Sequence, residues 1–200
     1  MKKLAFVAIV IAASLGVYWF VFKGTDVPEA PKQQAMQIAK HSTAFNNSFD
    51  SVMNAYFNLK SLFVEGDSTN AKAAVTNLIA ALDKLPMDEL KKDTTAIFAT
   101  ISQQISDVKA NALSIQQQPN ITEMRKDFSM VSENMYPLLK SIHYAGKIVY
   151  WQNCPMAFGE NNGANWISNT KEIVNPYMGK HHPEYKGTML GCGELLDSIH

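Results

Sequence analysis

FNNSFDSVMNAYFNLKSLF, residues 45–63, is the stretch that decides the fold. Its apolar side chains recur at steps of three and four residues, at Phe45, Phe49, Val52, Tyr56, Leu59 and Phe63. This spacing places them on one face of an α-helix. A helix with a single apolar face is stable only when that face is buried against other elements. The stretch therefore predicts one helix of a packed helical assembly.

Three further segments repeat the helical spacing, within residues 71–85, 90–117 and 124–142. The connections between the four segments are short, which favours an antiparallel up-down four-helix bundle over residues 42–147. We expect a mainly α fold with a small loop-rich C-terminal unit that contains short strands. Methionine fills gaps in helical cores. We expect four methionines in this core, at positions 53, 124, 130 and 135.

Polar residues and prolines mark the expected helix ends. Asp67 or Ser68 would cap the second helix, Asp88 the third, and Asn120 the fourth, because short polar side chains accept hydrogen bonds from the free N–H groups of a first turn. Pro137 lies inside the fourth pattern. Proline lacks an N–H donor and crowds the preceding turn, so it should kink this helix or end it early.

The N-terminus, residues 1–23, has the pattern of a membrane anchor. Lys2 and Lys3 precede an uncharged run from Leu4 to Phe22. At 1.5 Å per residue the run reaches roughly 28 Å, close to the thickness of a bilayer core. The leading lysines favour a cytoplasmic N-terminus, with the remainder outside the inner membrane, in the periplasm of a Gram-negative cell. The alternative is a cleaved signal peptide and a periplasmic protein, with the weak site at residues 12–14. Residues 24–41 read as a linker.

The charge balance excludes one class of partner. The chain has 18 basic and 18 acidic residues and no formal net charge. A nucleic-acid-binding domain needs a basic face, so we expect no nucleic-acid partner. No hydrolase, metalloprotease or phosphate-loop motif occurs, so we do not expect an enzyme.

Residues 148–200 differ from the helical part in composition. Residues 148–151 are β-branched and aromatic, a pattern typical of a strand, and 164–168 suggest a second short strand across a hairpin from 156–158. Asn, Gly and Pro recur between them. We expect this segment, residues 148–200, to pack on one end of the bundle, held by a disulfide, a metal ion or its aromatic side chains.

The two cysteines, Cys154 and Cys192, both lie in this C-terminal segment. In an oxidising compartment two such cysteines form a disulfide by default. The alternative is a metal site, because thiolate and thioether sulfur are soft ligands that suit monovalent copper or silver. Both alternatives require the tail to fold back so that the two cysteines meet. The candidate ligand set is Cys154, Met156, Met178, His181, His182, Met189 and Cys192.

The same segment contains four distinctive motifs: Tyr150-x-x-x-Cys154-Pro155-Met156-Ala157, Gly163-Ala164-x-Trp166, Ile173-x-Asn175-Pro176-Tyr177-x-Gly179 and Met189-x-x-Cys192-Gly193. In these motifs it resembles a known bacterial family, the domain of unknown function thirty-three forty-seven (DUF3347). The helical part resembles it too, with less distinctive residues. The resemblance implies an exported protein that handles copper or silver outside the inner membrane, because the domain also occurs at the end of some periplasmic adaptor subunits of heavy-metal efflux pumps. Residues 180–186, which contain both adjacent histidines, are an insertion to which no family role is carried.

Two functions follow as expectations. In the first, the protein binds copper or silver in the periplasm and passes the ion to an efflux adaptor or pump. In the second, a Cys154–Cys192 disulfide stabilises a structural module that docks on such an adaptor. The state of the two thiols distinguishes them.

Overall fold

The structure, a computed structural model, describes residues 41–92 and 95–199. The predicted anchor or signal peptide and nearly all of the predicted linker lie outside this range. Among the helices that the structure describes, none has the length and apolar character needed to cross a membrane.

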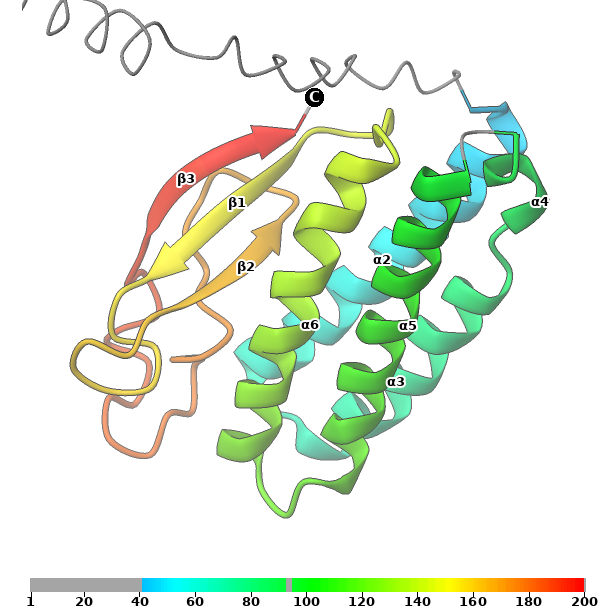
Figure 1. Cartoon of the computed structure of the whole chain (residues 1–200). Coiled ribbons are helices and arrows are strands. Elements are labelled where there is room, and N and C mark those ends of the chain that lie inside the picture. Colours follow the sequence, from blue (N-terminus) through cyan, green and yellow to red (C-terminus); the bar gives the residue numbers. More distant parts are fainter. Residues whose placement is uncertain (1–40, 93–94, 200) are drawn as a thin grey trace, which may run out of the picture. The chain divides into compact units, whose positions relative to one another are not determined.

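Four long helices form the bundle in Figure 1. They are α2 (Thr43–Glu65), α3 (Ser68–Asp83), α5 (Thr95–Gln117) and α6 (Ile121–Ser141), with the single turn α4 (Met87–Leu90) before α5. Helix α2 packs on α3, α3 on α5, and α5 on α6. The predicted mainly α, four-helix fold with a small C-terminal unit of short strands is confirmed.

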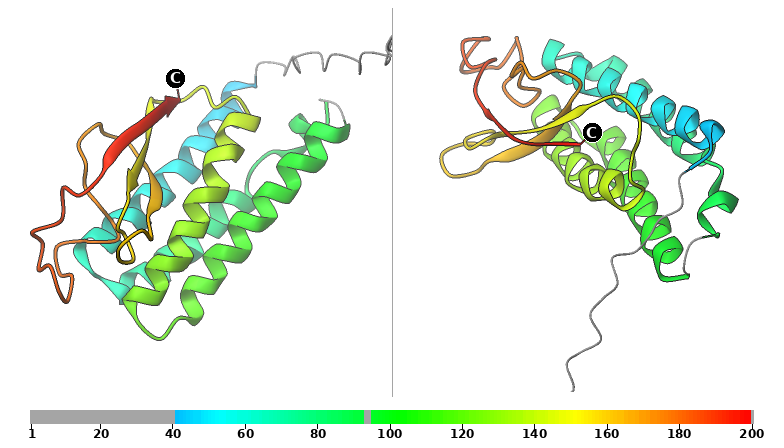
Figure 2. Two further views of the ribbon diagram at one scale, coloured as in Figure 1. Left: turned by 60° about the vertical axis from the view of Figure 1, so that its left-hand side comes forward. Right: turned by 90° about the horizontal axis from the view of Figure 1, so that it is seen from above.

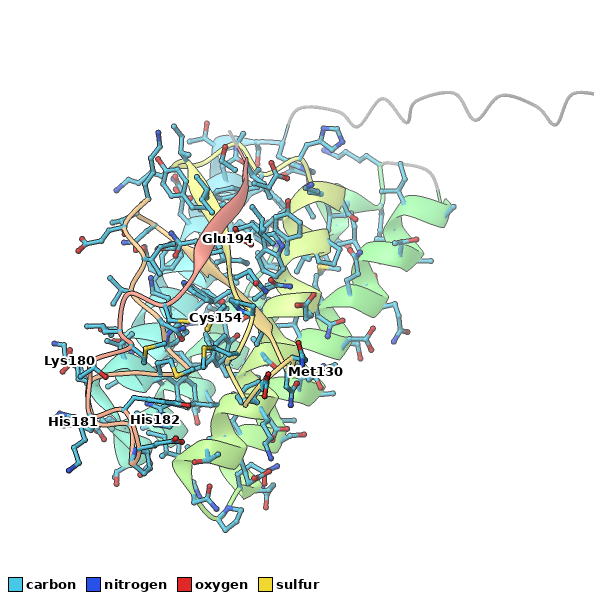
Figure 3. All side chains as sticks on the ribbon, turned by 90° about the vertical axis from the view of Figure 1, so that its left-hand side faces the viewer. Met130, Cys154, Lys180, His181, His182 and Glu194 are labelled. Carbon is cyan, nitrogen blue, oxygen red and sulfur yellow. The ribbon has the colours of Figure 1, made fainter. Side chains whose placement is uncertain are left out.

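The apolar stripes read from the sequence form the core. Tyr56, Phe63 and Phe128 stack in its centre, with the Phe128 ring centroid 5.3 Å from that of Tyr56 and 4.9 Å from that of Phe63. Three of the four methionines expected there are buried, at positions 53, 124 and 135. The prediction for Met130, which is labelled in Figure 3, is wrong, because its side chain is 49% exposed. Two residues after Phe128, it lies on the opposite face of α6.

The helix ends follow the sequence in part. The side chains of Asp67 and Asn120 cap α3 and α6, as predicted. Asp88 instead lies inside α4 and pairs with Lys91 at 2.6 Å, so it does not cap the long helix α5. Helix α6 continues to Ser141, four residues past Pro137, so this proline does not end the helix early.

A three-stranded antiparallel sheet follows the helices, in the order β2-β1-β3. Its strands are β1 (Val149–Cys154), β2 (Ala164–Ser168) and β3 (Glu194–Ile199). The strand predicted at 164–168 is confirmed, but the predicted partner is wrong. It pairs with β1, where Trp151 lies opposite Ile167, and not with residues 156–158, which form turns. Strand β3, the other neighbour of β1, was not predicted.

The sheet packs on the bundle through β2, which contacts α6 (Figures 1 and 2). Two buried polar contacts join β2 to α2. The backbone N–H of Ile167 donates to the Tyr56 hydroxyl at 3.1 Å, and Lys60 Nζ donates to Ser168 Oγ at 3.1 Å. Because buried polar groups without partners are costly, these contacts fix how the strand lies on the helix.

Candidate functional site

The sulfur atoms of Cys154 and Cys192 lie 2.7 Å apart, and both thiols are free. Cys154 is the last residue of β1 and is fully buried, whereas Cys192 lies in the turn before β3 and is partly exposed. The prediction that the tail folds back and brings the two cysteines together is confirmed. The pairing of Asn153 with Glu194 across the two strands is what aligns them.

The Asn-Pro-Tyr turn holds the second cysteine in place. The Asn175 side chain is fully buried. Its Nδ2 donates to the Cys192 carbonyl at 2.8 Å. Its Oδ1 accepts from the backbone N–H groups of Tyr177 at 2.8 Å and Met178 at 3.1 Å. An asparagine supplies donor and acceptor together. The first residue of the motif therefore orders its own turn and fixes the cysteine backbone.

Gly193, which follows the second cysteine, allows the strands to approach. Its φ is +146°, and a Cβ atom there would lie 2.5 Å from the Asn153 carbonyl oxygen and 2.9 Å from the Trp166 ring. Backbone of this kind is open to glycine and strained for other residues. The glycine after Cys192 is therefore needed for steric reasons. A side chain at this position would prevent β3 from pairing with β1 beside the thiols.

Burial raises the pKa of Cys192 to about 12, and the hydrogen bond and charge of Cys154 act in the same direction. At neutral pH Cys192 is therefore a neutral thiol. The thiolate is both the nucleophile and the metal ligand. An oxidant or a metal ion must displace a proton to use this sulfur.

Three of the remaining predicted ligands line one cavity. Met156, Met178 and His182 line a separate cavity of about 270 Å³, whose lining does not include either cysteine. His181 faces elsewhere: its Cβ lies 3.4 Å from the position that a Cβ on Gly66 would occupy.

Met189 is partly buried against the hydrophobic core.

In Figure 3 both histidines lie on the loop below Cys154. His182 Nδ1 accepts backbone hydrogen bonds from Glu184 and Tyr185, which leaves only Nε2 for a ligand. Within the described part of the chain, no three His, Cys, Asp or Glu side chains gather as a metal site.

Arg125 is a residue that the sequence reasoning missed. It is the only arginine of the chain, and it is 2% exposed. Its Nη2 donates to the Phe63 carbonyl at the end of α2, at 2.7 Å, whereas its buried Nε has no partner. The signal in the sequence was its position on the apolar side of α6, next to Met124. Gly179 leaves room for it, because a Cβ there would collide with Nη2.

Comparison with known proteins gives a family match for the helical part of the chain. Residues 52–146 match the sequence model of a family described as a protein of unknown function, DUF3347. No curated protein and no solved structure matches the chain. The match ends before Cys154, so the cysteine motifs lie outside it, and it carries no association with efflux adaptors. Over residues 52–146, which contain most of the helices that support the candidate site, this chain therefore matches the DUF3347 family.

Proposed function

We propose that this protein binds a soft monovalent ion, copper or silver, between Cys154 and Cys192 in their reduced state. The observation that carries the proposal is the meeting of two free sulfur atoms, 2.7 Å apart, from two separate chain segments. Soft thiolate ligands select Cu(I) over harder ions. The pairing of β1 with β3 and the Asn175 side chain hold both segments in place.

Binding would require a small movement and the loss of protons. A metal–thiolate bond is about 2.3 Å long for zinc, so two thiolates on one ion lie farther apart than the sulfurs do here. Cys192 is the sulfur with freedom to move, since it lies in a turn and is partly exposed, while Cys154 is fully buried. Because the ion replaces thiol protons, affinity falls as the pH is lowered.

The proposed setting is the outer side of the inner membrane, where the predicted N-terminal anchor would keep the protein and a periplasmic adaptor or pump would accept the ion. The methionines and histidines of the candidate set remain predicted ligands. We place the ion at the thiol pair because Met156, Met178 and His182 share their cavity with the Arg125 guanidinium, and its positive charge disfavours a second cation.

A second candidate function rests on the same short distance. Sulfurs this close need little movement to form a disulfide when an external thiol oxidant, such as another disulfide, takes up two electrons and the two thiol protons are released. The disulfide would close the loop from Cys154 to Cys192 and stabilise the fold by about 4 kcal/mol in the chain-entropy model. The outer strand β3 exposes Leu195 and Leu196, at 45% and 50%. A disulfide-stabilised sheet with this apolar edge would serve as a docking module.

Copper titration tests the first candidate. The reduced full-length protein is titrated with Cu(I) against a competing chelator. We expect one ion per chain with a Kd below about 1 µM, and loss of that binding in Cys154→Ser/Cys192→Ser. Met130→Leu, which changes an exposed sulfur of α6 outside the candidate set, is the matched control and should bind as before. Equal binding by the double serine variant would refute the proposal.

Thiol counting decides between the two candidates. Protein isolated from cells is alkylated under denaturing conditions, without reductant, and weighed by mass spectrometry. Two alkylated thiols together with bound copper favour the metal function. Two blocked thiols and no metal favour the disulfide module.

A further inference from the structure

We propose that the cavity beside Arg125 binds a small organic anion, whose carboxylate or phosphate group contacts the guanidinium and whose apolar part fills the rest. This site is separate from the thiol pair. The inference does not depend on the proposed metal function.

The buried guanidinium is the first observation. Taking an unpaired charge out of water costs several kcal/mol, so buried charges in proteins are normally paired. Among residues 41–92 and 95–199, no carboxylate forms an ion pair with Arg125. Its hydrogen bond to the Phe63 carbonyl uses one of five N–H donors, and its buried Nε–H has no acceptor among the residues that the structure describes. An anion would supply both the missing charge and the missing acceptors.

The place of the cavity is the second observation. Thr122, Arg125 and Lys126, from the first two turns of α6, line it. The start of a helix carries partial positive charge and favours anions. Lys126 adds a further cation at the exposed rim, although it also pairs with Glu123 at 2.9 Å.

One carboxylate, Glu184, lines the same cavity. It is exposed and is not paired with Arg125. Burial and the nearby charge of Arg125 lower the pKa of His182, so this side chain adds no positive charge near neutral pH. The buried positive charge in the cavity is thus that of Arg125, and Glu184 does not neutralise it.

The walls indicate the rest of the ligand. Apart from the polar groups above, the cavity is lined by sulfur-containing, aromatic and small apolar side chains, at Met156, Ala157, Phe158, Tyr177, Met178 and Tyr185. Its volume of about 270 Å³ is close to that of sites for small ligands. A charged group at one end and an apolar wall elsewhere fit an aromatic or short aliphatic acid, or the phosphate ester of such a group.

Nuclear magnetic resonance of the arginine side chain tests this directly. Because Arg125 is the only arginine, its Nε–H group gives one signal that needs no assignment. The full-length protein is titrated with benzoate, phenyl phosphate and the uncharged analogue benzyl alcohol. We expect the signal to shift with at least one anion at millimolar or lower concentration. Benzyl alcohol should bind at least about tenfold more weakly. The tighter anion then tells whether the site prefers carboxylate or phosphate.

Charge variants give the second readout, measured by calorimetry with the same probes. Arg125→Gln should abolish anion binding, and Lys126→Gln should weaken it severalfold. Lys109→Gln, a lysine of α5 that pairs with Asp83 and does not line the cavity, should leave it unchanged. If Arg125→Gln does not fold, the side-chain signal of the natural protein still decides. An unmoved signal with both anions up to about 10 mM, or an equal shift with benzyl alcohol, would overturn the proposal.

Discussion

The Asn175 side chain joins the Asn-Pro-Tyr turn to Cys192, because its Nδ2 donates to the cysteine carbonyl at 2.8 Å. The same side chain accepts from two backbone N–H groups of its own turn. Asn175→Ala would leave these buried groups without partners, each at a cost of about 1–3 kcal/mol. We expect a loss of at least about 2 kcal/mol in the free energy of unfolding, measured with urea.

The matched control for this variant is Asn111→Ala. The Asn111 side chain donates only to Asp107, one turn earlier on α5, and alanine favours helix. Its free energy of unfolding should change by less than about 0.5 kcal/mol. Equal effects of the two variants would show that Asn175 does not hold the cysteine turn.

Gly193 and Gly191 flank Cys192 and provide a second matched pair. A Cβ on Gly193 would collide with the Asn153 carbonyl, whereas a Cβ on Gly191 meets nothing within 4 Å. Gly193→Ala should cost about 2 kcal/mol or more, because the strands must move apart or the backbone must adopt a strained conformation. Gly191→Ala should lie within about 0.5 kcal/mol of the natural protein. Thermal unfolding followed by circular dichroism measures both, and a reversed order would contradict the steric explanation.

Lys60 makes stability depend on pH in the alkaline range. Burial lowers the pKa of Lys60 from 10.5 to about 8. Below pH 8 the ammonium is charged in the folded and unfolded chains, and its burial destabilises the fold by about 3 kcal/mol. Between pH 8 and 10.5 the folded chain gives up this proton while the unfolded chain keeps it. Stability therefore rises with pH in this window.

Comparison with Lys60→Met isolates this effect, because the other titrating groups are common to both proteins. The variant should be the more stable at pH 7, and its advantage should shrink steadily from pH 8 to 10.5. Urea unfolding at several pH values gives the difference. An advantage that does not change with pH would mean that folding does not lower the pKa of Lys60.

Cys192 should react slowly in the reduced, folded protein. Its pKa is raised to about 12, first by burial and then by Cys154, so at pH 8 very little thiolate is present. Alkylation of Cys192 by iodoacetamide, followed by peptide mass spectrometry, should be at least about tenfold slower than in urea. Cys154→Ser removes the second cause but not the first, so it should restore only part of the rate.

The helices could be predicted because their apolar residues repeat with the helical period, as at Phe49, Val52 and Tyr56. Strand β3 could not, because it is largely exposed and is held by backbone pairing with β1, which leaves no apolar pattern. The meeting of Cys154 with Cys192 was assumed by both site hypotheses, because a disulfide or a metal ion is one way to hold an irregular segment, beside the burial of its aromatic side chains. The cavity at Arg125 could not be predicted from the sequence, because it depends on how α2, α6 and the Asn-Pro-Tyr turn come together.

Strand β1 lies between one neighbour that follows after a short loop and another that comes from the end of the chain. Because residues 155–193 separate β1 from β3, this pair of strands should form more slowly than the β1–β2 hairpin. We therefore expect β1 to pair with β2 before β3 is added. Until β3 is added, Cys154 lacks the neighbouring sulfur that it has in the folded protein, so the last strand of the sheet is the one that completes the thiol pair.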